Sequence, residues 1–285
     1  MKKLLFFFSV FILVTSFHAS HSCNPLEAEQ AKQQSAHLRK HHVKSIVVDQ
    51  FFFNRDTLER EGNLYSVQKI NSNGNATDEK NYAATGLMLT HVTKAYQGEK
   101  LIKQEFWNYM TGKDTVYENY SYVYDNSGKL IEEKSYVESG TITRKWKYTI
   151  DPSGRITEAT LGIEHLREGW IGDKWKFAYD SAGHLIREEY TDWHGGSLNF
   201  RYTYTASGLL STKFNYTMKD SVLHKTTYIY DQSNRLTETC YTYKISKSSV
   251  REINTYNSKG LLIETKHIEQ DVPKYVLRYT YSFYN

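Results

Sequence analysis

The stretch YDNSGKL at residues 124–130 decides the fold, because variants of it recur down the chain. Each copy has an aromatic or aliphatic residue, an acidic or polar residue, a turn of Ser-Gly type and, in most copies, a basic residue and a leucine. A spacing of about 26 residues predicts a modular β fold in which each repeat supplies one supersecondary unit. The copies are YDNSGKL at 124–130, IDPSGRI at 150–156, YDSAGHL at 179–185, YTASGLL at 204–210, YDQSNRL at 230–236 and YNSKGLL at 256–262.

Each copy predicts a tight turn between two antiparallel strands. The glycine, or Asn234 in the fifth copy, supplies the positive φ that such a turn needs. The Asp or Asn at the start of the turn can cap it with its side chain. Because short turns join consecutive strands, we expect the repeats to form an antiparallel meander.

The strand that enters each turn has large side chains at every second position, with Thr, Ser, Lys and Arg between most of them. One face of the sheet is therefore buried or stacked and the other is wet. A single sheet with one apolar face has to curl, close or pack on a partner. We expect an all-β fold over residues 43–285, an antiparallel meander of β-hairpins curled into a barrel or a strongly twisted sheet. The alternating residues include Tyr120, Tyr122 and Tyr124; Trp146, Tyr148 and Ile150; Trp175, Phe177 and Tyr179; and Phe200, Tyr202 and Tyr204.

Before the first full copy the pattern is weaker. The segment YAATGLML at 82–89 resembles the copy at 204–210 and is interpreted as an early repeat. Gly86 lies 42 residues before Gly128, so this interpretation requires one stretched period. The segment NSNGN at 71–75 is predicted only to be a turn.

The first 22 residues are predicted to be a secretory signal peptide. Two lysines precede an apolar run at 4–14, which is too short for a stable membrane span, and small residues follow it. Cys23 lies in a loose lipobox that resembles the relaxed lipoprotein signals of Bacteroidetes-type bacteria, which would make it the lipidated first residue. Cleavage near Ala19 or Ser22 is the alternative and gives a soluble secreted protein. We therefore expect an exported protein, either a lipoprotein of the bacterial outer membrane or cell surface, or a secreted one.

The state of Cys240 depends on Cys23. If Cys23 carries lipid, Cys240 has no partner and is expected to be a small buried hydrophobic residue. If Cys23 is not lipidated, a disulfide between the two is open to an exported protein. Two cysteines supply neither a disulfide scaffold nor a metal site, so the sheet itself must provide the stability.

Residues 23–42 differ in composition from everything after them. Asn24 and Pro25 form a fair helix start, with Asn as the N-cap and Pro at the first helical position. Acidic residues near the start and basic residues near the end suit the helix dipole. Because apolar residues are few, such a helix would be weakly held. A mobile tether between membrane and domain is favoured over a helix docked on or inside the β domain.

The charge pattern excludes one class of partner. The formal net charge is +4, and most Lys and Arg residues are interspersed with Asp and Glu. This is not the basic stripe of a nucleic-acid-binding protein.

The signature resembles the YD repeat, also called the RHS repeat, over roughly residues 80–285. Thr205, Asn257 and Asn234 depart from its pattern. YD repeats of large toxins form β-sheets that spiral into a hollow shell, so the resemblance implies side-by-side hairpins and no activity. The chain is also similar to small exported bacterial proteins whose YD-like hairpins curl into a porin-like barrel. Because the strands carry many Lys, Glu and Arg instead of a lipid-facing apolar band, we expect a soluble barrel or a strongly twisted sheet.

Two segments are candidates for ligand binding. The longest repeat has its extra residues at 163–173, and another Trp-bearing turn falls at 191–196. Insertions in repeat proteins often lie on the binding face, and the apolar face and polar edge of Trp suit stacking on sugar rings. Trp170, Trp193 and His194 are therefore candidate glycan-binding residues. The alternative is that both tryptophans only pack between hairpins.

No constellation indicates catalysis, a metal or a cofactor. The histidines fall in different repeats without ligand spacing, so we expect them to be solvated. Carboxylates recur after the turn and are expected to form cross-strand pairs with Lys and Arg, not a catalytic pair. These carboxylates are Glu132, Glu158, Glu188, Glu238 and Glu264.

The sequence favours a non-catalytic binding or adhesion module for glycans or envelope proteins. The alternative is a structural shell or scaffold that encloses or presents a partner. We expect no enzyme activity, no cofactor and no nucleic acid partner, and membrane contact only through a lipid anchor. The sequence leaves the oligomeric state open.

Overall fold

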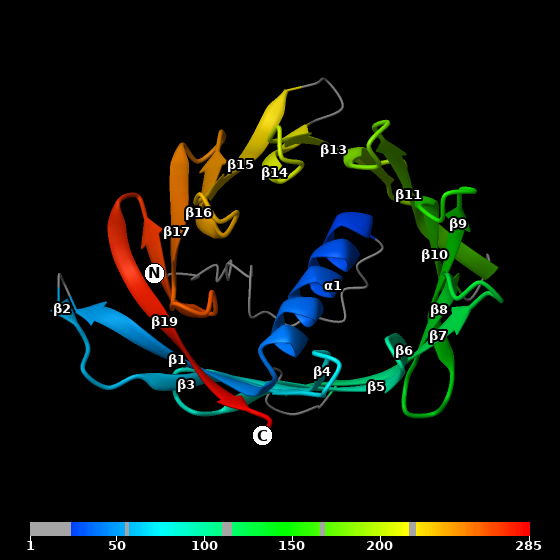
Figure 1. The fold of residues 1–285 in the computed structure, drawn as a ribbon. Helices are drawn as coiled ribbons and strands as arrows, with labels where there is room; N and C mark the ends of the chain where they lie inside the picture. Colours follow the sequence, from blue (N-terminus) through cyan, green and yellow to red (C-terminus); the bar gives the residue numbers. More distant parts are fainter. Residues whose placement is uncertain (1–23, 55–56, 110–115, 166–168, 217–220) are drawn as a thin grey trace, which may run out of the picture.

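The computed structural model describes residues 24–54, 57–109, 116–165, 169–216 and 221–285. One helix precedes a long run of strands (Figure 1). The elements are α1 (Pro25–Lys40), β1 (Val43–Asn54), β2 (Thr57–Leu58), β3 (Asn63–Ile70), β4 (Ala76–Tyr82), β5 (Met88–Gln97), β6 (Lys100–Asn108), β7 (Val116–Tyr124), β8 (Leu130–Tyr136), β9 (Ile142–Ile150), β10 (Ile156–His165), β11 (Gly169–Tyr179), β12 (Leu185–Thr191), β13 (Ser197–Tyr204), β14 (Leu210–Tyr216), β15 (Val222–Tyr230), β16 (Leu236–Tyr243), β17 (Ser248–Tyr256), β18 (Leu262–Glu269) and β19 (Val272–Phe283).

The sheet is an antiparallel meander that closes on itself. From β3 to β19 each strand pairs with the next one along the chain. β1 closes the ring because it pairs with β19 on one side and with β3 on the other. The two-residue strand β2 pairs only with the end of β1, so among the described residues eighteen of the nineteen strands form the barrel. The predicted all-β meander is confirmed, and it curls into a closed barrel.

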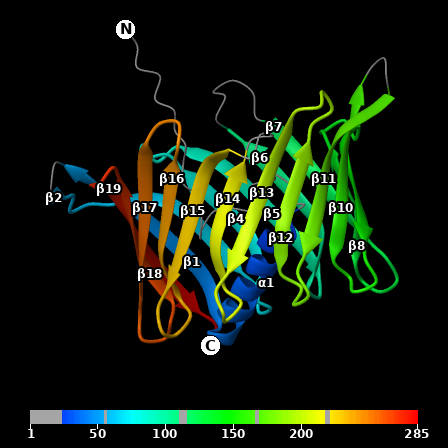
Figure 2. The same ribbon diagram turned by 90° about the horizontal axis from the view of Figure 1, so that it is seen from above.

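The alternation of side chains separates an inner from an outer face. Tyr202 and Glu188 contact Asn24 at the start of α1, which lies inside the ring (Figures 1 and 2). Their face of the sheet is therefore the inner one, and the large side chains that alternate with Thr, Lys and Arg share it. The charged side chains between them, such as Lys147 and Arg201, point outward.

The signature turns all lie on one end of the barrel, which we call the signature rim. Each begins with a residue whose backbone N–H and C=O bond across the turn, as Asp125 does with Lys129 and Gly128. The other end, which we call the opposite rim, has connections of more varied length. The five-residue turns of the signature rim are 71–75, 125–129, 151–155, 180–184, 205–209, 231–235 and 257–261.

The interpretation of 82–89 as the early repeat is wrong. The turn at 83–87 has the same backbone hydrogen bonds and a positive φ at Gly86, but it joins β4 to β5 on the opposite rim. The early copy is the turn at 71–75, where Gly74 lies 54 residues, or two periods, before Gly128. No period is stretched at this point.

A tyrosine at the end of the strand fastens most hairpins to the one before them. Tyr179 donates its hydroxyl hydrogen bond to the backbone oxygen of Ile156 at 2.7 Å, and Tyr230 donates to Leu210 at 2.9 Å. The last bond of the series runs from Tyr284 to the oxygen of Ile70 and crosses the point where the ring closes. We call these bonds tyrosine staples. They are made by Tyr96, Tyr124, Tyr179, Tyr204, Tyr230, Tyr256, Tyr281 and Tyr284.

The acidic and basic residues of the signature also have structural roles. Asp151 accepts hydrogen bonds from the backbone nitrogen and the Nε of Arg155. The guanidinium of Arg155 in turn lies 4.8 Å from the centre of the Tyr179 ring in the next copy. Backbone and side-chain bonds from Arg155 hold the pKa of the Asp151 carboxyl below its usual value. This copy thus caps its own turn and stacks on its neighbour.

The helix is ordered inside the barrel, so the favoured interpretation of 23–42 as a mobile tether is wrong for residues 25–40. Asn24 caps the helix by accepting the N–H of Leu26 at 2.9 Å, and Pro25 is its first residue. Leu38 near its end is 6% exposed and packs among the residues that close the ring. No helix within the described part of the chain is long and apolar enough to cross a membrane.

The apolar core has two parts. The seam core surrounds the closure of the ring and contains Leu38, Val43, Ile46, Val48, Ile70, Leu261 and Tyr279. The aromatic wall lines the inner face of β9 to β14 and contains Trp146, Ala159, Leu161, Phe177, Leu185, Tyr202 and Leu210.

Candidate functional site

Three aromatic rings form a row on the outer face of β5, β6 and β7. The His91 ring stacks on Trp107 with centres 4.9 Å apart, and the Trp107 ring lies 5.3 Å from that of Tyr117. All three side chains are partly exposed. We call this set the outer aromatic row.

The register of the sheet brings these rings together. His91 is directly opposite Trp107, and Trp107 is directly opposite Tyr117. Directly opposed residues on one face have closely spaced Cβ atoms, so large rings there must touch. Neighbouring inward residues, such as Val92 and Phe106, confirm by alternation that the row faces outward.

Polar groups surround the outer aromatic row. Asp78 lies 3.3 Å from Nε2 of His91. Glu105 accepts hydrogen bonds from Lys103 at 2.8 Å, from Thr93 at 3.0 Å and from Tyr117 at 3.2 Å. The bond from Lys103 lowers the pKa of Glu105, so its carboxylate is charged at neutral pH. The row therefore combines flat apolar faces with fixed hydrogen-bond acceptors at its edge.

None of the three residues of the outer aromatic row was predicted from the sequence to bind a ligand. His91 and Trp107 belong to strands that precede the first full signature copy, and Tyr117 lies on the strand that enters it. All three lie outside the two Trp-bearing segments at 163–173 and 191–196. The signal available in the sequence was Trp107, a large aromatic residue at an outward position of β6.

The predicted residues Trp193 and His194 lie in the turn between β12 and β13 on the opposite rim. The Trp193 side chain is 48% exposed, and its ring centre is 3.4 Å from that of His194. The turn is held by Asp192, which accepts from the backbone of His194, and by Asp173, which accepts from that of Trp193. Their role in binding stays a prediction.

Trp170 lies on the same rim, in the hairpin of β10 and β11, where its backbone is opposite Glu164. Its side chain lies outside the described part of the structure. Asp173 on the same strand also accepts a hydrogen bond from the hydroxyl of Tyr190, so β11 is tied to the Trp193 turn by one carboxylate.

Four of the five predicted carboxylates form cross-strand ion pairs on the outer face. Glu188 does not, and the prediction is wrong for it. It lies three residues after the leucine of its signature instead of two, so it points inward and is only 6% exposed. The outer pairs are Glu132 with Lys145, Glu158 with Lys174, Glu238 with Arg251 and Glu264 with Arg278.

The expectation of solvated histidines is also wrong for His267. Its side chain is on the inner face, is 2% exposed and stacks on Tyr275 with ring centres 4.5 Å apart. Within the described ranges no group of three or more His, Cys, Asp or Glu residues is placed to hold a metal ion.

The structure describes one of the two cysteines. Cys240 is a partly exposed free thiol on β16. Cys23 lies outside the described residues, so its lipidation stays a prediction.

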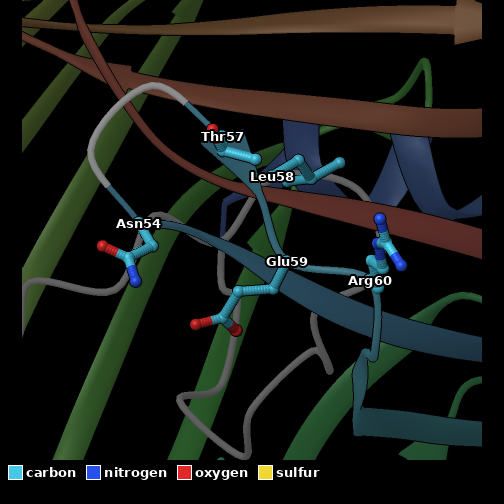
Figure 3. A pocket seen from close by; sticks show the side chains of 5 residues that line it. All are labelled: Asn54, Thr57, Leu58, Glu59 and Arg60. Atoms are coloured by element: carbon cyan, nitrogen blue, oxygen red, sulfur yellow. The ribbon is translucent and has the colours of Figure 1, made fainter.

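A shallow depression of about 530 Å³ lies on the opposite rim where β1 meets β2 (Figure 3). It is lined by Asn54, Thr57, Leu58, Glu59 and Arg60. These residues come from a single short hairpin and its flank, and most of them are exposed. The depression therefore lacks the enclosing walls of a small-molecule site.

The sequence matches no family model, and no curated protein is significantly similar to it. Among solved structures, a porin-like protein from Bacteroides uniformis aligns with a TM-score of 0.42 and 10% identity, over 85% of this chain and 97% of that one. A porin-like protein from Bacteroides vulgatus aligns with a TM-score of 0.30 and 10% identity, over 83% and 98%. A chain of the TcdB2-TccC3-Cdc42 complex aligns with a TM-score of 0.35 and 13% identity, over 75% of this chain but 14% of its own length. This chain thus spans about a seventh of that relative.

Proposed function

We propose that the protein is an exported, non-catalytic binding module of the bacterial cell envelope that recognises glycans with aromatic side chains on its surface. The observation that carries the proposal is the outer aromatic row, in which His91, Trp107 and Tyr117 form a continuous strip across three strands. Sugar rings present apolar faces that stack on such rings and hydroxyls that bond to acceptors at their edges.

The surroundings of the row support this ligand class. Glu105 and Asp78 are held in place by neighbours on adjacent strands, so they can accept hydrogen bonds from sugar hydroxyls without first being ordered. Trp193 and His194 offer a second exposed aromatic surface on the opposite rim.

The outer face supports a barrel surrounded by water. The ion pairs of Glu158 with Lys174 and of Glu238 with Arg251 lie on the outer surface of the strands. A charge facing the hydrocarbon of a bilayer costs about 2–4 kcal/mol near its midplane. The N-terminal signal and Cys23 then give the route to the envelope, through export and a lipid anchor.

We also assign the repeats to the YD type. The assignment is supported by the interlocking roles of the signature residues, since Asp151, Arg155 and Tyr179 form one cap and stack between two copies. This type of repeat builds the barrel and carries no activity of its own.

A glycan-array screen of the exported chain tests the proposal, with Trp107→Ala, Trp170→Ala and Trp193→Ala as separate variants. Ile245→Ala is the matched control because Ile245 is 84% exposed in another turn of the opposite rim. We expect Trp107→Ala to weaken binding of the selected oligosaccharide at least about tenfold and Trp107→Phe to retain part of it. Loss only in Trp193→Ala or Trp170→Ala would move the site to the opposite rim.

Absence of binding to any glycan by the unaltered chain would contradict the proposal. The second candidate, a shell that encloses a partner, would then stand. The specific observation that favours it is the closed ring with α1 inside it (Figure 1).

A further inference from the structure

We propose that α1 is a releasable crossbar of the barrel, latched to the inner wall at its N-terminal end by Asn24, Glu188 and Tyr202. When the latch breaks, α1 swings about its junction with β1 and uncovers the aromatic wall. The inference is independent of glycan binding.

The first step is that α1 is enclosed but not packed. Both views place it inside the ring (Figures 1 and 2). Ten of its sixteen residues are nevertheless exposed, and Leu38 is its one buried side chain. The space around the helix is therefore open to water, and packing along its length does not hold it.

The C-terminal end of α1 is fixed. Leu38 belongs to the seam core, and the chain passes within three residues from Lys40 into β1. The backbone of the helix also abuts the 71–75 turn, since a Cβ added to Gly74 would lie 1.9 Å from the oxygen of Ser35. This end cannot leave without opening the core that closes the ring.

The N-terminal end is held by polar contacts. The Asn24 side-chain amide donates to Oε2 of Glu188 at 2.7 Å and to the Tyr202 hydroxyl at 3.2 Å, and Tyr202 donates to the same carboxylate oxygen at 2.5 Å. Leu26 adds a partly buried contact with the aromatic wall. The same Asn24 side chain also caps the helix, so latching and helix order depend on one residue.

The latch depends on a carboxylate that is buried, since Glu188 is only 6% exposed. Glu188 is surrounded by the aromatic wall, with Lys213 from β14 as an attractive charge and Glu27 from α1 as a repulsive one. Burial raises the pKa of Glu188, which shows that the wall disfavours its charged form. A further negative charge beside Glu188 would have to share the attraction of Lys213 with it.

Asn24→Asp separates latching from capping. Asp caps helices as well as Asn does, but its carboxylate repels Glu188 and cannot donate to it. We expect hydrogen exchange of residues 28–36 to rise at least about tenfold in this variant, measured on the full chain by mass spectrometry. Acrylamide quenching of tryptophan fluorescence should rise with it, because Leu26 packs against the aromatic wall, which contains Trp146.

Two further variants complete the test. Glu188→Gln in the Asn24→Asp background supplies an amide donor for the new carboxylate and should return exchange towards that of the unaltered protein. Arg39→Ala removes the exposed ion pair with Glu99 at the fixed end and should leave exchange of 28–36 unchanged.

The inference is overturned if Asn24→Asp leaves the exchange of α1 unchanged. It is also overturned if exchange rises equally in β12 to β15, since α1 would then be part of the barrel core and not a separate element.

Discussion

The two rims of the barrel are built from similar turns but differ in how much of the fold depends on them. On the signature rim, a turn such as 151–155 is capped by Asp151, stacked on the next copy through Arg155 and stapled by Tyr179. On the opposite rim, the turn at 83–87 has the same backbone hydrogen bonds. None of the tyrosine staples ends there. Local turn chemistry is therefore common to both rims, whereas contact between copies is concentrated at one.

This difference indicates that the connections of the opposite rim can vary in length and sequence. The connections on the opposite rim range from the two residues between β18 and β19 to the seven between β6 and β7. The predicted ligand residue Trp193 also lies on that rim. Loops held by a rigid scaffold are the usual carriers of function.

A pair of glycine substitutions gives the largest expected contrast between the rims. Gly74 and Gly86 have φ of +82° and +80°, so Ala at either position meets the same backbone strain. At Gly74 the added Cβ also meets the backbone of α1, whereas at Gly86 it meets nothing within 4 Å. We expect Gly74→Ala to lower the free energy of unfolding by about 3 kcal/mol and Gly86→Ala by about 1 kcal/mol, measured by denaturant titration. Equal losses would show that α1 yields to the turn at no cost.

Removal of one staple comes next in size. Tyr230→Phe deletes the hydroxyl that donates to the oxygen of Leu210. We expect a loss of about 1–2 kcal/mol in the free energy of unfolding, because a partly buried carbonyl then lacks its donor. Tyr136→Phe is the control, since Tyr136 at the opposite rim only accepts a 3.3 Å bond from Ser121. A loss in Tyr136→Phe as large as in Tyr230→Phe would remove the distinction between the rims.

Addition of a tyrosine staple should raise the free energy of unfolding, by less than removal of one lowers it. Ile150 occupies the signature position that is tyrosine in the neighbouring copies, so the staple to Leu130 is missing there. Ile150→Tyr is expected to raise the free energy of unfolding by about 0.5–1 kcal/mol. A stability equal to or lower than that of the unaltered protein would mean that this copy is spaced differently from the rest.

The smallest effect concerns acid. Hydrogen bonds from Arg235 hold the pKa of Asp231 below its usual value, so this carboxylate adds stability above its unfolded-state pKa and loses it as the pH falls through the lower folded-state pKa. Asp231→Asn keeps the capping oxygen, as Asn257 does in the last copy, but removes the charge. Between pH 2 and 6, the free energy of unfolding of this variant should depend less on pH than that of the unaltered protein. The same pH dependence in both proteins would show that the charge of Asp231 does not stabilise the turn.

Much of the barrel could be predicted from the signature. The failures of prediction have a common cause. The meander follows from turns that close within five residues, so each copy specifies its own hairpin. The position of the early repeat was predicted wrongly because the turns at 71–75 and 83–87 form the same backbone hydrogen bonds. The two turns differ in the rim of the barrel on which they lie. The inward position of Glu188 depends on a shift of one residue along β12, which reverses the face of a side chain.

The outer aromatic row could not be predicted for a related reason. His91, Trp107 and Tyr117 are brought together by the register of β5 to β7, which carry no full signature copy between them. Trp193 could be predicted to be exposed because the residues next to it in the sequence indicate a turn.

The sequence by itself determined the repeat, the antiparallel hairpins, the alternation of faces and the helix start at Asn24, because each is set by residues a few positions apart. Only the tertiary structure decided that the ring closes and that α1 lies inside it. Closure pairs Val48 with Tyr279 and bonds Tyr284 to Ile70, contacts between residues more than 200 positions apart that no local pattern specifies. The latch of Asn24 on Glu188 could not be predicted for the same reason, since the two residues are 164 positions apart in the sequence.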